Sequence, residues 1–135
     1  MGQLVVDNPH IQAEEHPDLR VLVIRRTASR PESPETLVAA YREALQLSGR
    51  SYDGWGLLID SRLAPGRNDP AFETAMNALR LQASEVFPRV SVLVESAIGL
   101  LQSQRLRVES GAIGLITRDE DEAMAFAVRG EPRVE

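Results

Sequence analysis

Apolar residues follow two alternating patterns along this chain: short continuous runs, and longer stretches in which they recur every three or four positions. The first pattern is typical of buried strands and the second of amphipathic helices. Residues 11–14 alternate apolar and polar side chains, and residues 19–27 contain a continuous apolar run from Val21 to Ile24. Because residues 16–18 carry a turn signal, these segments predict an antiparallel hairpin whose second strand is covered on both faces.

Two helices are predicted to start with the same local signal, a capping residue followed by proline. Ser33 precedes Pro34, and Asp69 precedes Pro70. The cap accepts a backbone hydrogen bond, and proline lacks only an N–H that would be unpaired at the first helical position. Apolar residues then recur at helical spacing, which predicts one buried stripe in each helix. The stripes are Leu37, Ala40, Tyr41, Ala44 and Leu45 in the first helix, and Phe72, Ala75, Met76, Leu79, Ala83 and Val86 in the second.

Two more helices are predicted in the second half of the chain. Ser96 is expected to cap one of them, which Gly111 ends. Thr117 and Glu120 have the spacing of a capping box, so the last helix is expected to start behind Thr117. Its acidic first turn suits the positive end of a helix dipole. The inward-facing residues are Ala97, Leu100, Leu101 and Val108 in the first of these helices, and Ala123, Met124 and Ala127 in the second.

Three further apolar runs, at residues 55–60, 90–94 and 112–116, predict strands between these helices. The predicted order is β-β-α-β-α-β-α-β-α. Strands separated by helices imply crossover connections, so we expect a single α/β domain over residues 1–135 with a mixed, largely parallel sheet and an N-terminal antiparallel hairpin. The ordered core is expected over about residues 10–129, with loose ends before and after it.

Composition narrows the classes of partner and chemistry. The net charge of −5 opposes binding to a phosphate backbone, so we expect no nucleic-acid partner. The absence of cysteine excludes disulfides, thiolate metal sites and a cysteine nucleophile. No apolar run approaches the roughly 20 residues that span a bilayer, and the first residues lack the pattern of a secretory signal. We therefore expect a cytoplasmic protein without a membrane span.

Polar residues gather behind two of the predicted strands, where α/β sheets place their ligands. One group follows the strand that ends at residue 60, and the other follows the strand that ends at residue 94. They form either a small polar binding site, or an anchoring rim for a partner, or merely local ion pairs and helix caps. The candidate binding residues are Asp60, Ser61, Arg62, Arg67, Asn68, Asp69, Glu95 and Ser96.

No catalytic or metal-binding constellation is predicted. His10 and His16 are the two histidines, and both lie in or beside the predicted hairpin, far along the chain from these polar residues. A catalytic histidine needs a nucleophile and an orienting acid within reach, and a metal needs a closing set of ligands. The glycines at 54 and 56 precede a strand instead of following one, so they do not form a phosphate loop. We expect no cofactor.

Three stretches carry a resemblance to a known family. Residues 56–62 read Gly-Leu-Leu-Ile-Asp-Ser-Arg, an apolar strand that ends in an acid and is followed by a base. Residues 87–94 contain a short connection and then a strand that begins with arginine. Residues 116–123 contain the end of the last strand and the acidic start of the helix that follows it. In this order they resemble the SpoIIAA-like group of STAS-related domains over about residues 11–128. That resemblance implies a signalling module that acts by protein–protein contact.

The chain departs from the best-known members of that group at their regulatory serine. In related anti-sigma-factor antagonists, phosphorylation falls in an Asp-Ser-Ser-Gly-Leu motif at the start of the second helix. Residues 68–72 here read Asn-Asp-Pro-Ala-Phe and offer no hydroxyl group. The phosphorylation switch is therefore not expected in this chain.

The leading hypothesis is a non-enzymatic protein–protein interaction or regulatory module of the STAS or SpoIIAA-like type, with an unidentified protein partner and a possible homodimer. A second hypothesis is a binder of a small apolar or amphipathic ligand under the helix that contains Phe72 and Met76. A third is a hydrolase-type enzyme that uses Asp60, Arg62 and Glu95.

Overall fold

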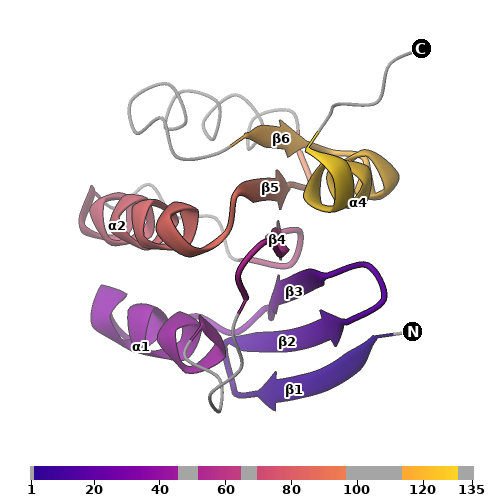
Figure 1. Ribbon diagram of the computed structural model, residues 1–135. Helices are drawn as coiled ribbons and strands as arrows, with labels where there is room; N and C mark the ends of the chain where they lie inside the picture. The colour runs from indigo at the N-terminus through magenta and orange to yellow at the C-terminus, as the bar shows by residue number, and fades with distance from the viewer. Residues whose placement is uncertain (1, 46–51, 65–69, 97–113, 131–135) are drawn as a thin grey trace.

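The computed structural model describes residues 2–45, 52–64, 70–96 and 114–130. These residues form an α/β domain in which one six-stranded sheet has helices on both faces (Figure 1). The strands are β1 (Gln3–Asp7), β2 (Ile11–His16), β3 (Val21–Arg26), β4 (Gly56–Asp60), β5 (Arg89–Leu93) and β6 (Leu115–Thr117), and the described helices are α1 (Pro34–Leu45), α2 (Pro70–Val86) and α4 (Glu120–Arg129).

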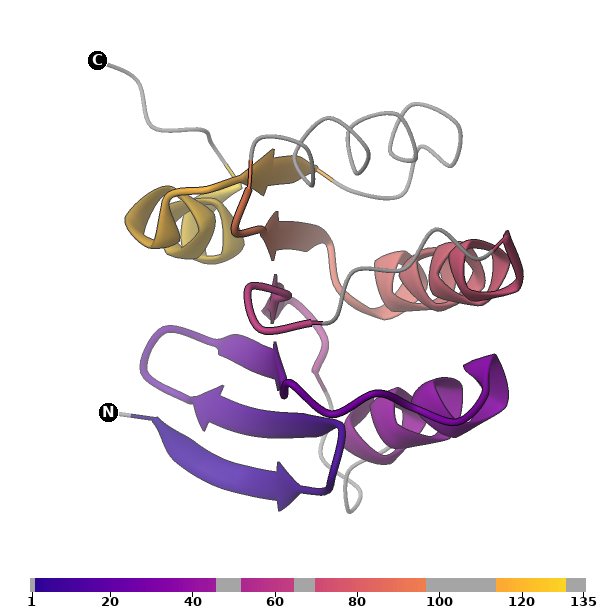
Figure 2. The same ribbon diagram turned by 180° about the vertical axis from the view of Figure 1, so that it is seen from behind.

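The strands lie in the sheet in the order in which they occur along the chain, from β1 to β6. β1, β2 and β3 pair antiparallel, whereas β3, β4, β5 and β6 pair parallel. The prediction of an α/β domain with a mixed sheet is therefore confirmed, with parallel pairing from β3 to β6. Because successive crossovers step across the sheet in one direction, α1 and α2 lie together on one face, and α4 covers the other (Figures 1 and 2).

The expectation that the first residues are loose is wrong, because they form β1. Its apolar residues Leu4, Val5 and Val6 add a strand to the predicted hairpin. Asn8 holds the connecting turn, since its Oδ1 accepts hydrogen bonds from the backbone of His10 at 3.0 Å and of Ile11 at 2.9 Å. A bulge interrupts the pairing at Val5.

Two hydrophobic cores lie on the two faces of the sheet. The larger one fills the space under α1 and α2, and the smaller one lies under α4. All five residues of β4 are buried, because this strand contributes side chains to both cores. The predicted strands with continuous apolar runs thus have covers on both faces.

The predicted stripe of α1 is confirmed for Leu37, Ala40, Tyr41 and Ala44, which are buried in the larger core. The prediction that Val86 at the end of α2 is buried is wrong, because this residue is 47% exposed. The neighbouring Phe87 is buried in the core instead, with an exposed fraction of 1%. The helix ends at Val86, so the turn that leads into β5 points Phe87 inward instead. Phe72, Leu79 and Ala83 are buried as predicted, and Ala75 is half-buried.

The helix caps are partly as predicted. Ser33 caps α1, since its Oγ accepts the backbone N–H of Thr36 at 3.2 Å. The capping box at Thr117 is wrong, because Thr117 belongs to β6 and Asp119 is the N-cap of α4. Asp119 Oδ1 accepts the backbone N–H groups of Asp121 and Glu122. The other predicted caps and the predicted stop lie outside the described residues or at their margin, namely Asp69, the helix behind Ser96, and Gly111.

Small residues let α4 lie very close to the sheet. A side chain at Gly56 would overlap the backbone carbonyl of Ala127. Ser91 Oγ donates a hydrogen bond to the carbonyl of Ala123 at 2.9 Å, and Arg89 Nε donates to the carbonyl of Ala127 at 2.9 Å. The helix backbone is therefore held directly by β4 and β5. Among the described helices, none is both long enough and apolar enough to cross a bilayer.

We predict that Gly56→Ala lowers the free energy of unfolding by about 1–3 kcal/mol, because the added methyl group must push α4 off β4. Chemical denaturation followed by circular dichroism measures this loss. Gly54→Ala is the matched control: Gly54 has a φ of 78° but open space around the new methyl group, so about 1 kcal/mol is expected from backbone strain alone. Hydrogen exchange of the α4 amides should accelerate only in the Gly56 variant, and equal rates would contradict this packing.

Candidate functional site

The carboxyl ends of β4, β5 and β6 lie side by side, and we call this end of the strands the carboxyl edge of the sheet. Asp60 pairs with Leu93, and Leu93 pairs with Thr117, so these strands end side by side. The backbone N–H of Ser61 donates to the carbonyl of Leu93 at 2.9 Å, which continues the pairing past the end of β4. α4 starts at the same edge, directly behind β6 (Figure 1).

Asp60 and Arg62 form a bidentate ion pair at this edge. Asp60 Oδ1 accepts hydrogen bonds from Arg62 Nε at 3.0 Å and from the Arg62 backbone N–H at 3.1 Å, and Oδ2 accepts from Nη2 at 2.8 Å. Nη2 also donates to Glu120 Oε1 at 3.0 Å. The Asp60 carboxylate is buried, whereas the Glu120 side chain is half exposed. The three side chains tie the loop after β4 to the first turn of α4.

Electrostatics keep both members of the buried pair charged. Burial by itself raises the pKa of Asp60, but the hydrogen bonds and positive charge of Arg62, together with the charge of Arg25, bring that pKa below its usual value. The hydrogen bonds to Asp60 in turn raise the pKa of Arg62. The carboxylate therefore stays ionised throughout the physiological pH range.

A hollow of about 670 Å³ lies between the end of β5, β6 and the start of α4. Its apolar wall consists of Val94 and Ile116, and its polar wall carries both signs of charge. Two of its lining residues are joined to each other, since Arg118 Nε donates to the carbonyl of Glu95 at 3.3 Å. The lining residues are Arg62, Val94, Glu95, Ile116, Thr117, Arg118, Asp119 and Glu122.

The predicted candidate residues are partly brought together. Asp60, Ser61 and Arg62 share the edge of the sheet with Glu95, and Ser96 is exposed beside Glu95. Arg67, Asn68 and Asp69 lie outside the described residues. The local ion pair that was one of the alternatives is present between Asp60 and Arg62.

Sequence reasoning missed the contribution of α4. The sequence assigns Glu120 only to an acidic helix start and gives Arg118 no role, yet Glu120 contacts Arg62 and Arg118 lines the hollow. The predicted strand order contains the signal that identifies these residues. Residues that follow the last strand of a parallel sheet lie at the same end of the sheet as residues that follow its neighbouring strands.

The two histidines lie apart from this hollow. His16 lies at the opposite end of the sheet from Asp60, because β2 runs antiparallel to β3, and its Nε2 contacts Glu14 Oε1 at 2.8 Å. His10 precedes β2, and its backbone carbonyl accepts the N–H of Thr27. Within the described ranges, no group of three His, Asp or Glu side chains could hold a metal ion.

Comparison with known proteins assigns this chain to no family. No family model, no curated protein and no solved structure matches the chain. The resemblance to SpoIIAA-like domains therefore stays a prediction.

We predict that Asp60→Asn lowers the free energy of unfolding by about 1–3 kcal/mol at neutral pH, because Arg62 loses a charge-assisted partner. The pH profile provides a second readout. The folded-state pKa of Asp60 lies below its unfolded value of about 3.9, so its ionisation stabilises the fold above that pH, and the stabilisation is lost as the pH falls through the folded pKa.

Urea unfolding between neutral and acid pH should therefore show a shallower acid loss for Asp60→Asn than for the wild type. Glu120→Gln is the control: it alters the exposed partner of the same arginine and should cost about 0–1 kcal/mol. Parallel acid profiles for Asp60→Asn and the wild type would show that the pair does not couple protonation to folding.

Proposed function

We propose that this domain is a non-enzymatic protein–protein interaction or regulatory module of the STAS or SpoIIAA-like type. One observation carries the proposal: the acidic group best placed for chemistry, Asp60, is fully engaged by Arg62. A general base or nucleophile needs an accessible lone pair and a pKa matched to the working pH. A buried carboxylate with a lowered pKa and three hydrogen bonds has neither property, so it is better suited to fixing a surface than to reacting.

The hollow beside this pair has the character of a recognition surface. Arg118, Glu95 and Glu122 place positive and negative charges around an apolar wall. Polar rims around apolar centres, with charges that complement a partner, give protein–protein contacts their specificity. The hypothesis of a hydrolase-type enzyme receives less support, because Asp60 and Arg62 are already paired with each other.

We predict that Arg118→Glu weakens capture of the partner at least about tenfold, because it reverses a rim charge without touching either core. The measurement is crosslinking and pull-down from the native host, with captured proteins quantified by mass spectrometry. Arg129→Glu is the matched control, since it reverses an exposed arginine at the other end of α4. A monomer that captures nothing in an Arg118-dependent way, but turns over a metabolite, would overturn the proposal.

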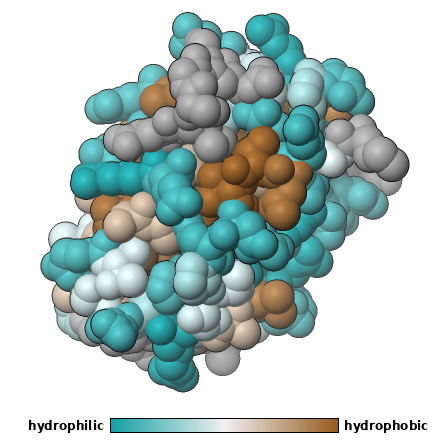
Figure 3. Space-filling view, turned by 90° about the horizontal axis from the view of Figure 1, so that it is seen from below, coloured by the Kyte–Doolittle hydropathy of each residue, from teal (hydrophilic) through white to brown (hydrophobic). Residues whose placement is uncertain are grey.

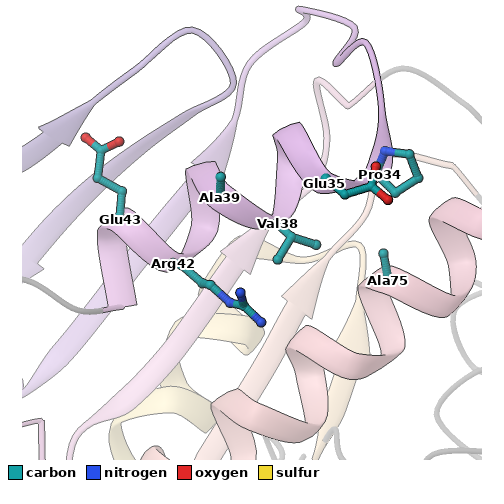
Figure 4. Close-up of a pocket in the computed structure, with 7 residues that line it drawn as sticks. All are labelled: Pro34, Glu35, Val38, Ala39, Arg42, Glu43 and Ala75. Carbon is teal, nitrogen blue, oxygen red and sulfur yellow. The ribbon is translucent and has the colours of Figure 1, made fainter.

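A second candidate function is the binding of a small amphipathic ligand, and a hollow of about 590 Å³ between α1 and α2 favours it. Figure 4 shows Val38 and Arg42 pointing from α1 toward α2, where Ala75 faces them. The apolar side chains of Val38 and Ala75 lie beside charges of both signs, because Glu35 and Glu43 line the hollow together with Arg42. This lining suits an amphipathic ligand with an apolar chain and a polar head. The expected place for such a ligand is under the helix that contains Phe72 and Met76, which is α2. Phe72 itself is buried in the larger core, and the side chain of Met76 lies outside the described residues.

We predict that, if this hollow holds a ligand, Ala75→Phe abolishes binding of a fluorescent fatty acid by filling the space. Ala71→Phe is the matched control, because it makes the same substitution at an exposed position of α2 that does not line the hollow, and it should leave binding intact. Native mass spectrometry of the purified wild type gives an independent readout. Absence of both added mass and fatty-acid binding removes this candidate and leaves the interaction module in place.

A further inference from the structure

Arg26 is a buried charge at the carboxyl edge of the sheet. Charged residues normally lie at the surface, as the hydrophilic areas on the face viewed in Figure 3 illustrate. Arg26 is the last residue of β3, which runs parallel to β4, and its exposed fraction is 9%. Its Nε is buried and has no hydrogen-bond partner among the described residues. Arginine stays protonated in proteins, so this side chain holds a charged donor without an acceptor.

The other buried polar side chains of the described residues all have hydrogen-bond partners. They are Glu15 with Tyr52, Asp60 with Arg62, Ser91 with the carbonyl of Ala123, and Thr117 with the N–H of Asp119. His10 Nδ1 is also buried without a partner, but a neutral imidazole has one nitrogen without a proton, and that nitrogen needs no acceptor. A buried donor on a charged group is costlier to leave unpaired, so Arg26 is the residue that requires an acceptor.

The side chain of Arg26 lies on the face of the sheet that α1 and α2 cover. Successive strand residues alternate between the two faces, and directly paired residues share a face. Ile24, two residues earlier, and Ile11, which pairs with Arg26, both belong to the larger core on that face. Because α1 and α2 follow β3 and β4 along the chain, the positive ends of their dipoles lie at the carboxyl edge.

The acidic residue at the end of the neighbouring strand does not serve Arg26. Asp60 pairs with Arg25 and lies on the opposite face, where Arg62 occupies both of its oxygens. Ser61 follows Asp60 and therefore lies on the face of Arg26, since its backbone N–H continues the pairing of β4 with β5. The half-buried Ser61 thus offers Arg26 a neighbouring hydroxyl group and no carboxylate.

We propose that Arg26 and the hydroxyl group of Ser61 bind an oxyanionic group of a small ligand, a carboxylate or a phosphate, at the carboxyl edge under α1 and α2. The planar guanidinium group presents parallel donors that match two oxygens of such a group. The anion supplies the acceptor that Nε lacks, and the two helix dipoles favour its negative charge. This site goes beyond the proposed function, because it lies on the other face of the sheet from the Asp60–Arg62 pair and shares no residue with the hollow at Arg118.

Thermal unfolding of the full chain tests the site, with sodium phosphate and sodium acetate titrated separately at an ionic strength held constant with sodium chloride. The midpoint of the wild type should rise and then saturate with at least one of the two anions, and the anion that acts identifies the group. Arg26→Met should weaken that binding at least about tenfold. Arg25→Met is the matched control, because it removes the same charge from the adjacent residue on the opposite face and should keep the response. A wild type that responds to neither anion, or equal responses of the two variants, overturns the proposal.

The stability of Arg26→Met without phosphate or acetate gives a second, independent readout. Replacing a buried charge that has no partner by an apolar side chain of similar length is neutral or stabilising. The midpoint of this variant should therefore equal or exceed that of the wild type in chloride alone. A fall as large as that of Asp60→Asn would show that Arg26 has an acceptor within the chain, and it would overturn the proposal.

Discussion

Direct contact between the backbone of α4 and the sheet is the constraint on which the candidate site depends. Gly56 has no side chain because the carbonyl of Ala127 occupies that space, and Ser91 and Arg89 donate to carbonyls of the helix. These contacts lie in the middle and at the end of α4, yet they fix the direction of the whole helix. Its first turn is thereby placed above the carboxyl ends of the strands, where Glu120 reaches Arg62.

The ion pair at that edge stabilises the fold and, in the proposed function, also fixes the surface that a partner would contact. A buried carboxylate without a partner is strongly unfavourable, so Asp60 requires Arg62. Arg62 then has one nitrogen that also contacts Glu120, and this contact holds the loop after β4 against α4. The pairing that makes Asp60 unreactive therefore also makes the rim of the hollow rigid, and a rigid polar rim loses less entropy on binding a partner.

The sequence predicts elements well where two local signals agree. α1 has a serine cap, a proline and a helical stripe, and the structure contains all three. Predictions fail where one signal stands alone: Thr117 has the spacing of a cap, but the pairing of β6 extends to it and leaves Asp119 to cap α4. β1 was missed because a short apolar run has no periodicity, and its partner strand decides whether it pairs. Contacts such as that of Glu120 with Arg62 join residues far apart in sequence, so they follow from topology alone.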